Sequence, residues 1–165
     1  MNSEEARGVL EAVGEPPAAV LRALQTEIKL SDFVLGGVVG RTAQTVRRWR
    51  REPEVDVPDN ATAAIDDLRT VVAMMVKAEF DGATIKQFLL SRNTGLGQDR
   101  PLDGVRVGLG AFRRVEHVTE CFIAGVAPEP GSALSGRDGE EFEQAIVDLP
   151  QEPDPPREPV GLKRG

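Results

Sequence analysis

Residues 31–51 read SDFVLGGVVGRTAQTVRRWRR and carry the signals of two short helices separated by a glycine turn. The first half is apolar and ends at Gly40, a residue type that favours the left-handed backbone found at helix ends. Thr42 is a good N-cap for a second helix that runs to about residue 51. In that helix Val46 and Trp49 lie three residues apart, so both are expected to face the core. The stretch therefore predicts two packed helices joined by a tight turn.

The outer face of the second predicted helix is rich in arginine. Residues 41–51 contain five arginines and no acid, although the whole chain has a formal net charge of −7. The pattern resembles that of bacterial helix-turn-helix repressors, in which the N-terminal part of the second helix enters the major groove. This resemblance implies operator DNA as a partner. The expected DNA-binding residues are Thr42, Gln44, Thr45, Arg47, Arg48 and Arg51.

The expected roles differ along this helix. Gln44 can pair with adenine and Arg47 with guanine, while Arg48, Arg50 and Arg51 are better placed for phosphates. A homodimer is expected, because paired units that read two half-sites gain an affinity that one short helix lacks. The alternative is a solvated, arginine-rich helix face that contacts no DNA.

The whole chain is expected to be all-α, with three parts. Residues 1–55 form an N-terminal bundle with the helix-turn-helix, and residues 56–125 form a small helical partner-binding domain. Apolar side chains at helical spacing, for example in residues 60–79, support this division. Residues 126–165 hold seven of the twelve prolines and nine acids against four bases, which predicts a disordered acidic tail.

One stretch of this predicted tail allows a second interpretation. Phe142, Ile146 and Leu149 lie at the spacing of one helix face. They could form a short amphipathic helix that orders on a partner, or the spacing could be a chance pattern.

A second family resemblance lies in residues 88–125, FLLSRNTGLGQDRPLDGVRVGLGAFRRVEHVTECFIAG. An apolar pair, an asparagine–glycine loop, an Arg-Pro-Leu-Asp step and a C-terminal glycine follow in the order seen in the toxin-binding domain of the Xre/MbcA/ParS antitoxins. The stretch resembles that domain, which implies a partner toxin with a RES domain, an enzyme that consumes NAD. In that family the C-terminal end of the domain blocks the toxin's active-site cleft. The implied toxin-binding residues are Asn93, Leu96, Gly97, Arg100, Pro101, Leu102, Asp103 and Gly125.

The chain departs from the family pattern at three points. Gln98 and Asp99 stand where the family tends to have a second glycine and a non-acidic residue, and Gly104 is expected to weaken the short helix that begins at Pro101. The alternative, that these residues serve only the fold, also stays open. The glycine-rich loop could be only a linker, and Arg-Pro-Leu-Asp is a common helix start, since proline and an acid both suit the first turn.

Enzyme chemistry is not indicated, and no cofactor or metal is expected. His117 is the only histidine and Cys121 the only cysteine. We expect neither a catalytic residue nor a metal ligand, and we expect His117 to be structural. No apolar run approaches the roughly 20 residues that span a bilayer, so a cytoplasmic protein is expected. Two functions remain: an antitoxin that also represses its operon, or a free-standing regulator whose C-terminal half only dimerises.

Overall fold

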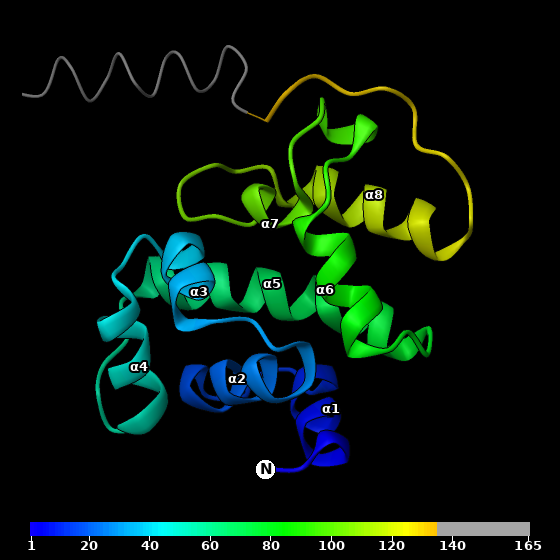
Figure 1. Ribbon diagram of the computed structural model, residues 1–165. Helices are drawn as coiled ribbons and strands as arrows, with labels where there is room; N and C mark the ends of the chain where they lie inside the picture. The colour runs from blue at the N-terminus through cyan, green and yellow to red at the C-terminus, as the bar shows by residue number, and fades with distance from the viewer. Residues whose placement is uncertain (135–165) are drawn as a thin grey trace, which may run out of the picture. The chain divides into compact units, whose positions relative to one another are not determined.

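The computed structural model describes residues 1–134, and that part of the chain is all-helical, as expected (Figure 1). The helices are α1 (Ser3–Glu11), α2 (Pro17–Ala23), α3 (Asp32–Val39), α4 (Ala43–Arg51), α5 (Asp59–Lys77), α6 (Gly82–Leu90), α7 (Pro101–Gly104) and α8 (Phe112–Ile123). Two short turns complete the set: a π-helical turn at Leu24–Ile28 and a 3₁₀ turn at Thr94–Leu96. The stretch at residues 142–149 lies outside the described residues.

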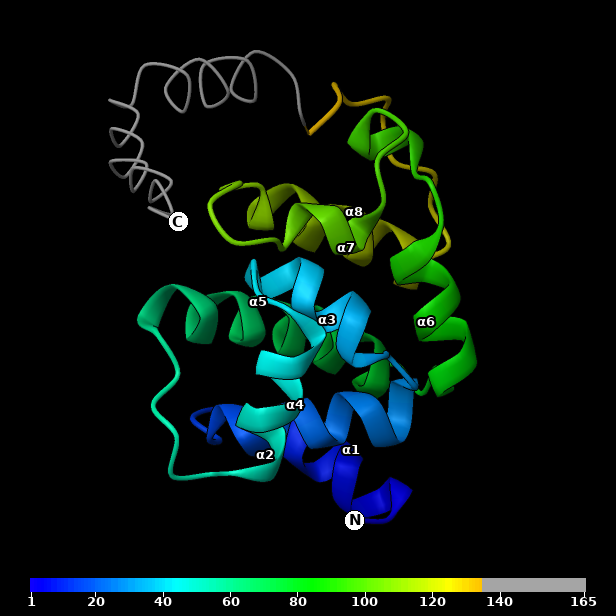
Figure 2. The same cartoon turned by 60° about the vertical axis from the view of Figure 1, so that its left-hand side comes forward.

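Helix α5 is the central element. It packs against α1, α2 and α3 and also against α8, so it runs between the N-terminal helices and the C-terminal ones (Figures 1 and 2). Its buried stripe includes Ile65, Leu68, Val72 and Met75. These side chains belong to one hydrophobic core that extends from α1 to α8. Residues on both sides of position 55 therefore share this core within the compact unit Met1–Leu134.

The short helices begin where side chains can cap them. The side-chain oxygens of Ser31, Thr42 and Asp81 accept hydrogen bonds from the backbone N–H three residues on, at 3.2, 3.2 and 2.7 Å. Such caps satisfy N–H groups that lack a partner in the first turn. Helix α7 begins at Pro101, as expected, and is short, because it ends at Gly104.

Arg69 of α5 is a charged residue that the fold buries. Arg69 of α5 donates from Nε to Asp66 Oδ1 at 2.7 Å and from Nη1 to the Leu10 carbonyl at 3.1 Å, and its Nη2 donates to Thr70 Oγ1. The last turn of α1 contains no basic residue of its own. Arg69 thus brings a positive charge to the C-terminal end of α1, where the helix dipole favours one.

The expected beginning of the tail at residue 126 is wrong for residues 126–134. This segment lies against the loop before α7, and we call it the strap. Leu134 is buried, and the Gly131 N–H donates to the Thr94 carbonyl at 2.9 Å. Its hydrogen-bond partners Thr94, Asp99 and Arg114 lie 18 or more positions earlier in the sequence, so composition alone did not reveal the packing.

Candidate nucleic-acid interface and adjoining groove

Helices α3 and α4 form the expected pair of short helices joined by a tight turn. Gly40 adopts the left-handed conformation (φ 65°) at the end of α3, and the Arg41 N–H donates to the Gly36 carbonyl at 2.9 Å. A Cβ atom at Gly36 would lie 2.6 Å from the Arg41 carbonyl oxygen, too close for any other residue type without movement. Gly36 thus permits the close approach of α3 to the turn before α4. Its neighbour Gly37 has open space around it.

Helix α4 buries one face and exposes the other. Val46 and Trp49 are buried, as predicted. Gln44, Arg47 and Arg48 are exposed on the opposite side, and so is Arg51. The expected DNA-binding side chains therefore lie on one accessible surface.

The two threonines of the expected set have a structural task. Thr42 Oγ1 accepts from the Thr45 backbone N–H at 3.2 Å, and the two hydroxyl oxygens lie 3.0 Å apart. Thr42 is exposed and Thr45 half-buried. The pair fixes the first turn of α4, and Thr42 still has its side chain at the surface.

Acidic side chains neutralise part of the charge of α4. Arg48 forms an exposed ion pair with Glu52 at 3.3 Å. Arg47 and Arg50 both donate to the same oxygen of Asp32, at 3.3 and 3.2 Å. Within residues 1–134, Arg41 and Arg51 have no ion-pair partner at 4 Å or less, so these two carry full positive charge at the two ends of the helix.

The asparagine–glycine loop, residues 93–98, is closed by hydrogen bonds between its own residues. Asn93 Oδ1 accepts from the Gly95 N–H at 2.8 Å, and the Asn93 carbonyl accepts from Gln98 N–H at 2.9 Å. Leu96 is fully buried, and Gly97 is left-handed at φ 62°. These residues shape the loop, which accounts for their order in the sequence without a partner protein.

The strap covers this loop. A Cβ atom at Gly97 would overlap the backbone of Ala133, and the Leu134 N–H donates to Asp99 Oδ2 at 2.6 Å. From α8, Arg114 Nη2 donates to the Ser132 carbonyl at 2.7 Å. The surface that Gly97 would offer to a toxin is therefore occupied by the chain's own strap.

The Arg-Pro-Leu-Asp step forms α7 and one wall of a groove. Pro101 and Leu102 are buried, whereas Arg100 is exposed and donates from Nε and Nη2 to the two carboxylate oxygens of Asp103, both at 2.9 Å. These hydrogen bonds hold the pKa of Asp103 below its ordinary value. Of the eight implied toxin-binding residues, only Arg100 and Gly125 are exposed, while Asn93, Gly97 and Asp103 are half-buried.

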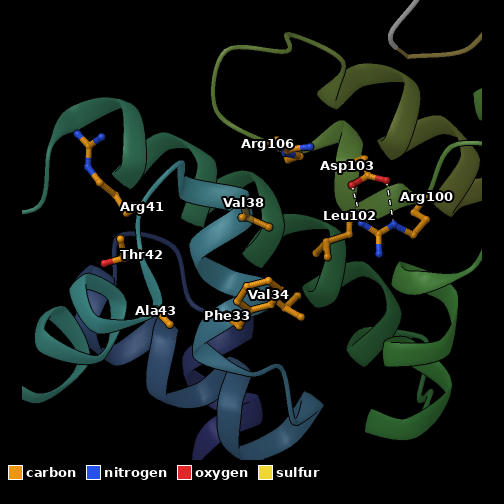
Figure 3. A pocket seen from close by; sticks show the side chains of 11 residues that line it. Phe33, Val34, Val38, Arg41, Thr42, Ala43, Arg100, Leu102, Asp103 and Arg106 are labelled. Carbon is orange, nitrogen blue, oxygen red and sulfur yellow. Dashed lines mark hydrogen bonds and ion pairs between the residues drawn. The ribbon is translucent and has the colours of Figure 1, made fainter.

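The groove runs between α7 and the helix-turn-helix and has a volume of about 580 Å³ (Figure 3). Val34, Val38 and Leu102 supply apolar side chains, and Phe33 lies at its rim with 80% of its surface exposed. Arg41 and Arg106 add positive charge. The sequence did not reveal this groove, because its two walls are about sixty residues apart in the chain.

No known family model, no curated protein and no solved structure matches this chain. Both resemblances therefore remain expectations carried by the residues themselves.

The described residues offer little for other chemistry. In residues 1–134 no group of three or more His, Cys, Asp or Glu side chains is arranged to hold a metal ion, and no helix there is long and apolar enough to cross a membrane. His117 is exposed on α8, with Nε2 at 3.8 Å from Cys121 Sγ and Nδ1 at 3.8 Å from Glu120.

Proposed function

We propose that this protein is a DNA-binding regulator of the antitoxin type. Helix α4 reads operator DNA as part of a homodimer, and the region of residues 60–125 binds and neutralises a RES-domain toxin that consumes NAD. One observation carries the proposal: the exposed face of α4 presents Gln44, Arg47, Arg48 and Arg51 together, on a helix-turn-helix anchored by buried Val46 and Trp49.

The geometry of α4 supports the DNA-binding part of the proposal. The polar side chains lie at the start and along the outer face of α4, the part of a recognition helix that contacts base edges and phosphates. Arg41 and Arg51 supply unneutralised charge at both ends. The acids Asp32 and Glu52 lower the net charge of the surface, so binding should be weak for one copy and stronger for a pair.

The test is a double substitution in the full chain, Arg47→Ala with Arg48→Ala. The probe is a pool of DNA duplexes of about 40 base pairs with a randomised centre, long enough for two half-sites. The wild-type protein should enrich a paired sequence, and the variant should bind that sequence about a hundredfold more weakly, since each lost contact costs about 1–3 kcal/mol.

A control variant carries the same change in charge on other helices: Arg22→Ala on α2 with Arg113→Ala on α8, both exposed. It should keep its affinity within about twofold, because phosphate contacts act over short distances at cellular salt. If the wild-type protein enriches no sequence, or if both double variants lose affinity equally, α4 does not read DNA.

The toxin-binding part rests on the order of residues in the stretch 88–125. The groove supports the toxin-binding proposal, because its lining includes exposed Arg100, half-buried Asp103 and the apolar side chain of Phe33. A large exposed aromatic residue beside charged groups is typical of a protein-binding surface. Co-expression with the product of the neighbouring gene tests it: a RES-domain enzyme should co-purify with the full chain and lose activity.

A second candidate is a free-standing regulator whose C-terminal half only supports folding and dimerisation. Two observations favour it: Leu96, Pro101 and Leu102 are buried, and the strap covers Gly97. This candidate predicts a DNA-binding dimer and no inhibition of the neighbouring gene's product. A fragment from residue 60 would not separate the candidates, because α5 shares its core with α1, α2 and α3.

A further inference from the structure

Asp32 lies beneath the exposed face of α4, although it belongs to the first turn of α3. Its side chain is 10% exposed, and its Oδ2 accepts from Arg47 Nε at 3.3 Å and from Arg50 Nη2 at 3.2 Å. One carboxylate oxygen thus connects the first helix of the helix-turn-helix to two arginines of the second. The α4 sequence alone does not show this contact.

The two arginines are held in different ways. Arg47 is bound through Nε and its side chain is 53% exposed, so both terminal amino groups stay free. Two parallel N–H donors of this kind match the O6 and N7 acceptors of guanine. Arg50 is only 20% exposed and turns one terminal amino group inward to Asp32. Arg47 is therefore presented outward, and Arg50 is withheld from the surface.

The contact between Asp32 and Arg50 is not arranged to give the fold its greatest stability. Among the described residues, Asp32 Oδ1 and Arg50 Nε are buried without a hydrogen-bond partner. A buried carboxylate stabilises a protein only when its remaining lone pairs are satisfied. The dipole of α3 favours an acid in its first turn, but it does not require that the acid contact two arginines of α4.

We propose that Asp32 is a specificity-determining residue of the DNA interface. It orients the Arg47 guanidinium toward a guanine and keeps Arg50 from adding a phosphate contact that would act on any sequence. This inference rests on the proposed DNA-binding function. Phosphate contacts raise affinity for all sequences alike, whereas an oriented bidentate arginine raises affinity for one base.

The experiment compares the wild-type full chain with Asp32→Asn, which keeps the size of the side chain and removes its charge. The probes are the duplex that the wild-type protein enriches from the random pool and a duplex of the same length with a scrambled centre. Asp32→Asn should bind the scrambled duplex severalfold more tightly and the enriched duplex no better. The ratio of the two affinities should fall about tenfold, part of the discrimination that one bidentate arginine provides.

A matched control is Glu52→Gln, which removes the exposed acid paired with Arg48. It should tighten binding to both duplexes alike and leave their ratio unchanged. A third comparison places Asp32→Asn in an Arg47→Lys background. Lysine keeps the charge but has no planar fork, so Asp32→Asn should then change the ratio by less than about twofold, since coupled residues are not additive.

The outcomes separate this inference from the function on which it rests. If the wild-type protein enriches no sequence, the DNA-binding proposal fails. If it enriches one and Asp32→Asn leaves the ratio of affinities unchanged, or lowers it equally in the Arg47→Lys background, Asp32 does not act through Arg47. Thermal unfolding of each variant shows that the compared proteins are folded at the temperature of the binding assay.

Discussion

Gly104, the last residue of α7, allows a direct test of how closely α7 lies on α8. A Cβ atom there would lie well inside 3.0 Å of Val115 Cγ2, a separation that real Cβ atoms essentially never show, and 3.1 Å from Leu134 Cδ1. Val115 is fully buried. Overpacking of this kind costs about 1–3 kcal/mol, while alanine in place of glycine gains about 0.5–1 kcal/mol in an unstrained helix. We therefore expect Gly104→Ala to lower the free energy of unfolding by about 1–2 kcal/mol.

The clash can be relieved from the other side. Val115→Ala removes the methyl group that a new Cβ would meet, and alone it costs about 1–3 kcal/mol in lost burial. The double variant should be more stable than the sum of the single losses by about 1 kcal/mol, because the two sites are in contact. Urea unfolding followed by far-UV circular dichroism measures all three variants. An unchanged or higher stability of Gly104→Ala, or strict additivity in the double variant, would refute the tight α7–α8 contact.

Two further predictions concern charged groups. Arg69→Ala should lower the free energy of unfolding by about 2–4 kcal/mol, because it leaves the Leu10 carbonyl without this donor and opens a space beside α5. Urea unfolding measures this loss, and a loss under about 0.5 kcal/mol would contradict the prediction. The Asp103 pKa is lowered chiefly by the hydrogen bonds from Arg100, so the stability it adds is present above about pH 4 and is lost as the pH falls through its folded-state pKa. The stability difference between wild type and Asp103→Asn should therefore shrink between about pH 7 and about pH 3, and a constant difference would show that the ion pair does not contribute.

The parts of the fold that follow from local signals could be predicted from the sequence. Thr42, Val46 and Trp49 specify the cap and the buried face of α4 within eight residues, and the structure places them as expected. The all-helical class of residues 1–134 follows from similar local patterns. Neither depends on knowing which distant segments meet.

The site could be predicted only in part, because its remaining contacts join distant segments. Asp32 meets Arg47 and Arg50 only after α3 and α4 have packed. The strap at residues 126–134 contains two prolines and a glycine and reads as a linker. Its order comes from hydrogen bonds to distant residues, as between Leu134 and Asp99, thirty-five positions apart. The groove beside Phe33 likewise needs α7 and α3 together.

Two of the departures from the antitoxin pattern, Gln98 and Asp99, have different consequences in the structure. Gln98 has φ 74°, a left-handed conformation that glycine adopts freely and glutamine disfavours, so a glycine here would suit the loop better. Asp99 instead takes part in the packing of the strap: its carboxylate accepts the Leu134 N–H and anchors the end of the strap. The acid and the strap belong together. Asp99 therefore holds the strap over the loop that the resemblance assigns to a partner, so a protein that binds this loop would also contact the strap.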